Sequence, residues 1–233
     1  MNKHHKTLLA DIEKQKGRGS EHSAKDSYML SGHFYYDISV PVRRMVVKEW
    51  LKNNPKLTNK EMIALVDSLY HGKSHEEKSV ASRLLANRDL RATVSLKQLD
   101  EWLGELVGWA EIDGICQNTY TAEELLGKWK QWESFLRKLS KDKNINKRRA
   151  SIVLLTGPIT YSNDKRILAL SFELIDKLKH EKPIIISKAI SWLLRSGVKQ
   201  HKKAIGEYVK KNSETLPKIA VRETVRKIET GRK

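Results

Sequence analysis

Apolar residues recur along much of the chain at intervals of three and four positions, the spacing that gathers them on one face of an α-helix. In the segment "LTNKEMIALVDSLYHG" (57–72) this stripe consists of Ile63, Leu65, Val66 and Leu69. Capping boxes, in which a hydroxyl residue is followed three positions later by Glu, predict where three helices begin. These boxes are Thr58 with Glu61, Ser74 with Glu77, and Thr121 with Glu124.

After the box at Thr121, Trp129, Trp132, Phe135, Leu136 and Leu139 recur at helical spacing. Further helical stretches are expected near 41–54, 95–108, 144–156, 163–180, 184–196, 199–212 and 217–229. Prolines, which helix interiors exclude, fall at or near the predicted starts and ends: Pro41, Pro55, Pro183 and Pro217. The tripeptide "TGP" at 156–158 predicts the sharp end of one helix. The β-branched run "IIIS" at 184–187 continues with helical periodicity, so we interpret it as the first turn of a helix.

This succession of helices with short connections predicts an all-α fold. We expect a right-handed α-α superhelix, a solenoid of antiparallel HEAT-like repeats of about 40 residues each. The whole chain, 1–233, would form this single domain. Because no repeat of the sequence itself is visible, a compact helical bundle is the alternative architecture.

The charge balance adds a functional indication. The sequence has 45 Lys and Arg against 28 Asp and Glu, a formal net charge of +17. Such an excess indicates a polyanionic partner, because neutralised phosphates release condensed counterions. Acidic residues are also frequent, so we interpret the chain as a folded basic domain that binds nucleic acid. The alternative is that the charge serves only solubility.

Several kinds of site are not expected. Cys116 is the only cysteine, which excludes an intramolecular disulfide and a cysteine-based zinc site. The sequence has no phosphate-binding glycine loop, no serine-nucleophile elbow and no zinc-protease motif, and His71 with His75 makes an incomplete ligand set. We therefore predict no metal and no cofactor. The absence of a membrane span or signal peptide favours a cytoplasmic protein, and the segment 17–27 is interpreted as a joint between helices.

Four segments occur in an order and spacing that carry a resemblance. They are "SYMLSGHFYYDISVPVRRMVVKEWLK" (27–52), "GWAEIDGIC" (108–116), "NKRRASIVLLTGP" (146–158) and "IISKAISWLLR" (185–195). Together they resemble the DNA alkylation repair family, the AlkD-type alkylpurine DNA glycosylases built from HEAT-like repeats. Each motif alone has low specificity, but the ordered set is specific and covers the chain from about Tyr28 to about Ile228.

The resemblance implies a set of site residues. Asp113, Trp109 and Trp192 match the catalytic Asp and the two active-site Trp residues. Arg149 matches the family's DNA-contacting Arg, with Arg148 as the alternative register. Further contacts to DNA are expected in the matched segments from Tyr28, Arg43, Arg44, Lys188 and Arg195. The family's enzymes hydrolyse the N-glycosidic bond of cationic N3- and N7-alkylated purines in duplex DNA, held against a basic concave face, without metal or cofactor.

The residue types fit that chemistry. A cationic alkylpurine is a good leaving group, and breaking its glycosidic bond builds positive charge at the sugar carbon, as in glycoside hydrolysis. A carboxylate such as Asp113 can stabilise that charge and orient water, while Trp faces attract cations. Trp109 and Asp113, four positions apart on a helix, would lie on one face.

Simpler explanations exist for the same residues. Trp50, Trp102, Trp129 and Trp132 lie in apolar stripes and are predicted to be core residues. Asp113 could instead cap a helix that begins near Gly114, or pair with a lysine. At the level of the whole protein, the alternatives are a non-catalytic protein that binds bent or branched DNA and a HEAT scaffold for protein interactions. A monomer is the default expectation.

Overall fold

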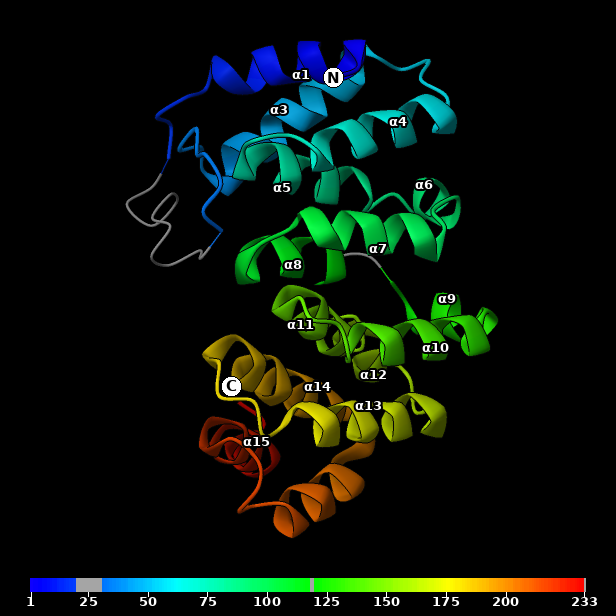
Figure 1. Cartoon of the computed structure of the whole chain (residues 1–233), viewed down its shortest axis with the longest axis vertical. Coiled ribbons are helices and arrows are strands. Elements are labelled where there is room, and N and C mark those ends of the chain that lie inside the picture. The colour runs from blue at the N-terminus through cyan, green and yellow to red at the C-terminus, as the bar shows by residue number, and fades with distance from the viewer. Residues whose placement is uncertain (20–30, 118–119, 233) are drawn as a thin grey trace. The chain divides into compact units, whose positions relative to one another are not determined.

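The computed structural model describes residues 1–19, 31–117 and 120–232 (Figure 1). Every regular element in these ranges is a helix, and their only β-type pairing is an isolated bridge between Phe34 and Ser74. The chain divides into two compact units, Met1–Thr119 and Tyr120–Lys233. Most of the expected joint at 17–27, and Tyr28, lie outside the described residues.

The first unit is built from helices that pack against their neighbours in the sequence. They are α1 (Lys3–Glu13), α3 (Val40–Asn53), α4 (Asn59–Tyr70), α5 (His75–Leu84), α6 (Arg88–Ala92), α7 (Leu96–Glu105) and α8 (Gly108–Gln117). Helix α5 packs against α3, α4 and α8. Leu65, Leu69 and Trp102 are fully buried in this unit, and each such side chain contributes roughly 1.5–3 kcal/mol of burial free energy.

The second unit has the same construction. Its helices are α9 (Ala122–Gly127), α10 (Trp129–Leu139), α11 (Ile145–Val153), α12 (Thr156–Tyr161), α13 (Lys165–Leu178), α14 (Ile184–Lys211) and α15 (Lys218–Thr230). Helix α14 packs against α11, α12, α13 and α15, and its apolar face is buried at Ile190 and Leu193. The prediction of an all-α fold of packed HEAT-like helical repeats is confirmed in both units.

The local signals for helix starts are confirmed as well. All three predicted capping boxes form, at the N-termini of α4, α5 and α9. Pro183 and Pro217 are the N-cap residues of α14 and α15, and the run at 184–187 is the first turn of α14 as predicted. A fourth capping box, Ser95 with Gln98, opens α7.

Some boundaries differ from the prediction. The tripeptide at 156–158 does not end a helix: α11 ends at Val153, and these residues open the short helix α12. Pro158 is tolerated there because first-turn residues need no backbone N–H donor. The stretches 184–196 and 199–212 are two helical segments within α14, separated at His201, whose φ of −130° and ψ of 35° are not helical, so the break lies a few residues later than predicted.

The tryptophan predictions are mostly confirmed. Trp50, Trp102 and Trp132 are 3%, 0% and 4% exposed, so they are core residues. The prediction for Trp129 is wrong, because its ring is only half-buried and lies beneath the Arg166 guanidinium, with 5.6 Å from Cζ to the ring centroid. None of the described helices combines the length and the apolar character needed to cross a membrane.

Candidate functional site

Helix α8 carries the Trp–Asp pair singled out by the sequence. Gly108 begins the helix with φ of +77°, a conformation that favours glycine. Trp109 follows in the first turn and is half-buried, and Asp113, one turn later, is 8% exposed. Asp113 therefore lies inside α8, and the alternative that it caps a helix beginning near Gly114 is wrong.

The start of α8 is fixed by a buried carboxylate. The side chain of Glu111 accepts a hydrogen bond from the backbone N–H of Val107 at 3.0 Å, which satisfies a donor beside the helix N-terminus. The same carboxylate lies 3.0 Å from His33 Nδ1 and 3.2 Å from His75 Nδ1. An ionised carboxylate only accepts hydrogen bonds, so each imidazole donates through a protonated Nδ1.

Electrostatics at Glu111 favour its charged form. Burial opposes ionisation, but the hydrogen bonds from His33, His75 and Val107 outweigh it and hold the pKa of Glu111 below its ordinary value of 4.5. The Glu111 carboxylate therefore ties α8 both to α5, through His75, and to the segment that contains His33. This arrangement fixes the helix that presents Trp109 and Asp113.

Helix α3 carries two of the expected DNA contacts in different environments. Arg44 is exposed, whereas Arg43 is 6% exposed and shares the buried face of α3 with Val46, Val47 and Trp50. Tyr28, expected to line the same cleft, lies outside the described residues.

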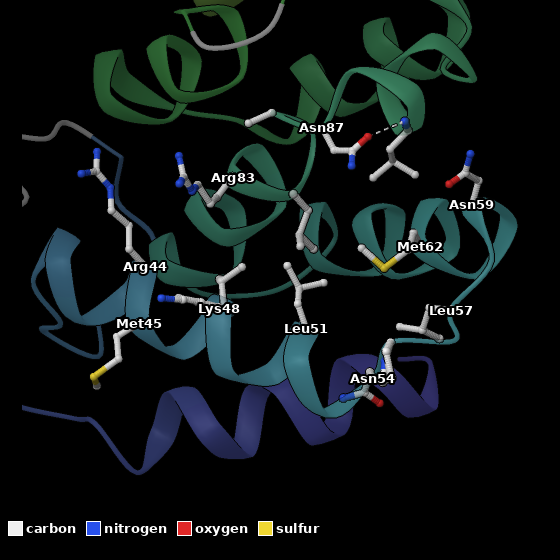
Figure 2. A pocket seen from close by; sticks show the side chains of 15 residues that line it. Arg44, Met45, Lys48, Leu51, Asn54, Leu57, Asn59, Met62, Arg83 and Asn87 are labelled. Carbon is white, nitrogen blue, oxygen red and sulfur yellow. Dashed lines mark hydrogen bonds between the residues drawn. The ribbon is translucent and has the colours of Figure 1, made fainter.

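An open groove of about 880 Å³ runs along α3 and is bounded by residues of α4, α5 and α6. Arg44, Lys48 and Arg83 gather at one end of this groove, which we term its cationic end, and Leu57 and Met62 lie at the other (Figure 2). No acidic side chain of the described ranges lines it. The groove therefore suits an anionic group at its cationic end.

In the second unit, the two candidate arginines of α11 have distinct contacts. The Arg148 guanidinium pairs with Glu181 at 2.8 Å and donates to the backbone carbonyl oxygens of Asp142 and Lys143. Arg149 is 4% exposed and donates from Nη1 to the carbonyl oxygen of Ile185 in the first turn of α14. Arg149 thus links α11 to the helix that carries the remaining candidates.

Those remaining candidates share one face of α14. Lys188, Trp192 and Arg195 follow one another at intervals of four and three residues, so they project to the same side. Lys188 is exposed and Trp192 is half-buried, while the buried stripe of α14 lies on the opposite face. Arg195 Nε lies 3.3 Å from the carboxylate of Glu223. The face therefore presents an aromatic ring flanked by two cations.

Sequence reasoning did not identify Glu111, His33 and Arg83 as site residues. A local signal existed for Glu111, an acidic residue in the first turn after a glycine, but none for His33, which is 78 positions away from it. Across the described ranges, no group of three or more His, Cys, Asp or Glu side chains is placed to hold a metal ion.

The fold and the site together define a basic helical-repeat protein that presents a Trp–Asp pair on one helix and cationic side chains on others. Residues 10–228 match the model of the DNA alkylation repair enzyme family, and the chain belongs to that family. Its fold resembles a solved structure described as a predicted DNA alkylation repair enzyme from Enterococcus faecalis. That match has a TM-score of 0.70 and 19% sequence identity, covering 88% of this chain and 93% of the other. No curated protein matches the sequence.

Proposed function

We propose that this member of the DNA alkylation repair family is a monofunctional DNA glycosylase that releases cationic N3- or N7-alkylated purines from duplex DNA. The observation that carries the proposal is the arrangement on α8, where a half-buried Trp109 stands one helical turn before a carboxylate, Asp113, that is 8% exposed. An aromatic face beside a desolvated carboxylate is complementary to a cation that forms during a reaction.

The reaction follows from this complementarity. The bond between the sugar C1′ and the purine nitrogen breaks, and its electron pair neutralises the charge on the leaving base. Positive charge develops at C1′ and the ring oxygen, where the Asp113 carboxylate stabilises it. A water molecule then bonds to C1′ and gives its proton to Asp113 or to solvent, so the products are the free alkylpurine and an abasic site.

The second aromatic position and the cationic side chains supply binding. We propose that Trp192 contacts the cationic nucleotide through its ring face, and that Lys188, Arg195 and Arg149 contact the DNA backbone. Arg43 and Arg44 do the same from α3. These residues lie on both units, so we propose that the whole chain acts in binding DNA.

Base release from a defined lesion tests this proposal. A duplex with a single N7-methylguanine is incubated with the protein, and the free base and the abasic site are both quantified against a protein-free sample. The account predicts release of N7-methylguanine in a 1:1 ratio with abasic sites, and no borohydride-trapped covalent complex, because water is the nucleophile. Tight DNA binding without release would instead define a non-catalytic DNA-binding protein, and no specific binding would favour a scaffold.

A further inference from the structure

Beside α8, the first unit contains a small pocket whose walls are unusually cationic. It has a volume of about 100 Å³, room for roughly three waters. It is lined by Val40, Arg43, Arg44, Val47, Ser79, Val80, Ser82, Arg83 and Gly114. Three of these residues are arginines, and no acidic side chain among the described residues lines the pocket. We refer to it as the arginine pocket.

Arg43 is a buried cation whose guanidinium is not fully hydrogen-bonded among the described residues. Its side chain is 6% exposed, and two of its buried nitrogens, Nε and Nη1, have no hydrogen-bond partner among the described residues. Burial lowers the pKa of Arg43, and the nearby Glu76 charge opposes that effect. The Glu76 carboxylate is itself engaged by the backbone N–H groups of Tyr36 and Ile38, at 3.0 and 3.3 Å. A buried cation with unmet donors destabilises a fold unless something binds it.

The pocket is reachable from the surface, because Arg44 and Arg83, which line it, are exposed. Arg44, Val47 and Arg83 line both the arginine pocket and the groove, so the two adjoin each other; Arg44 and Arg83 are labelled in Figure 2. Its wall on α8 is formed by Gly114, where a Cβ atom would lie 3.3 Å from Ser82 Oγ. Helices α5 and α8 therefore approach closely there.

We infer that the arginine pocket binds one phosphate group, and that this phosphate belongs to the DNA strand that occupies the site beside α8. A phosphodiester compensates the buried charge of Arg43, while the exposed Arg44 and Arg83 supply hydrogen-bond donors and further charge. Gly114 directly follows Asp113 in α8, so a phosphate held against Gly114 would position the backbone next to the candidate catalytic carboxylate. That placement rests on the proposed function, whereas the phosphate site itself does not.

An alternative is that Arg43 is a structural residue of the core and the pocket holds only water. The two accounts make opposite predictions for Arg43→Met, which replaces the charged side chain with a linear apolar one. If the charge is retained for a ligand, its removal raises the urea midpoint of the DNA-free protein, as expected for a binding residue that costs stability. If Arg43 is structural, the midpoint falls.

DNA binding on an unmodified duplex supplies the second readout and requires no chemistry. Arg43→Met and the exposed variant Arg83→Met are each expected to weaken binding about tenfold and to lower the log–log salt slope by about one. Arg88→Met, on α6 outside the pocket, is the matched control for loss of one positive charge and should leave the slope unchanged. Because Arg83 is exposed, its variant tests the pocket even if Arg43→Met folds poorly.

Single methylphosphonate linkages, which neutralise one phosphate at a time, identify the source of the phosphate. One linkage is expected to weaken wild-type binding and to have no further effect in Arg43→Met, the non-additivity of a shared contact. Inorganic phosphate should shift the NMR signal of Gly114 only at millimolar concentrations, and tight binding of it would point to a free-phosphate site instead. Equal methylphosphonate effects in wild type and Arg43→Met at every position would overturn the inference, whether or not the protein releases alkylated bases.

Discussion

The Nδ1 atom of His33 lies 3.0 Å from each carboxylate oxygen of Glu111, across 78 positions of sequence. Glu111 is 2% exposed and stands two residues before Asp113 on α8. The hydrogen bonds of Glu111 with His33 and His75 thus anchor α8, the helix that carries the candidate catalytic pair. Rigid placement of a carboxylate is what electrostatic stabilisation of a transition state requires.

Replacing Glu111 should therefore destabilise the first unit. Glu111→Gln keeps the shape but removes the charge that accepts from His33, His75 and Val107, and we expect a loss of about 2 kcal/mol in the free energy of unfolding. Urea denaturation monitored by circular dichroism measures it. Glu101→Gln on α7 is the control, because its ion pair with Lys97 is exposed and 3.9 Å long. Equal, small effects of both substitutions would contradict a stabilising role for the network.

Acid should weaken the fold through the same carboxylate. The folded-state pKa of Glu111 is lowered from 4.5, so its contribution to stability is complete above about pH 4.5 and is lost as the pH falls through the folded-state pKa. Glu77, which accepts from His5 and Ser74, behaves in the same way. We expect the urea midpoint to fall as the pH is lowered from about 5 to about 3, the window set by these groups. The fall should be less steep in Glu111→Gln. An identical slope in that variant would remove Glu111 from the acid sensitivity.

A salt titration of DNA binding should distinguish side chains that contact the DNA backbone from arginines that only stabilise the protein. Lys188 is exposed on α14 and forms no ion pair within the described ranges, so Lys188→Ala should make the log–log salt slope of DNA binding shallower by about one. Arg148 already donates to Glu181 and two backbone carbonyls. Arg148→Ala should thus lower stability while leaving the slope unchanged, and the reverse pattern would exchange the roles assigned to these two residues.

Trp109 should accelerate base release through its ring face. A Trp beside a desolvated cation is worth about 0.5–2 kcal/mol, so Trp109→Leu should reduce single-turnover base release about tenfold. Trp109→Phe keeps a weaker aromatic face and should retain an intermediate rate. If the Leu and Phe variants released the base as fast as wild type, the ring would have only a packing role.

Much of the fold was predictable because its signals are local. Capping boxes, prolines and apolar periodicity span three to eleven residues, and they located the principal helices. Helix α1 was implied only by the joint predicted after it and was given no bounds, since it is polar and only His5, Leu8 and Ile12 of it are buried. The sequence indicated two helices within the range of α14, and the non-helical His201 does separate two helical segments; only the position of the break, expected at 197–198, differs.

The site was less predictable because its contacts are distant in sequence. The Trp–Asp pair could be identified, since both residues fall in one short motif that carries the family resemblance, but the pairing of Glu111 with His33 has no local pattern. The burial of Arg43 did have a signal, because it stands three, four and seven positions before Val46, Val47 and Trp50 and so falls on the apolar stripe of α3. That arginine was predicted only as a DNA contact.

The most direct test of the central claim is a comparison of wild type with Asp113→Asn on duplex DNA that contains N7-methylguanine. The account predicts that the variant binds the duplex within a few-fold of wild-type affinity while single-turnover release of the base falls by about 10² or more. Retained release, or equal losses in affinity and rate, would contradict the assignment of Asp113 as the carboxylate that stabilises the transition state.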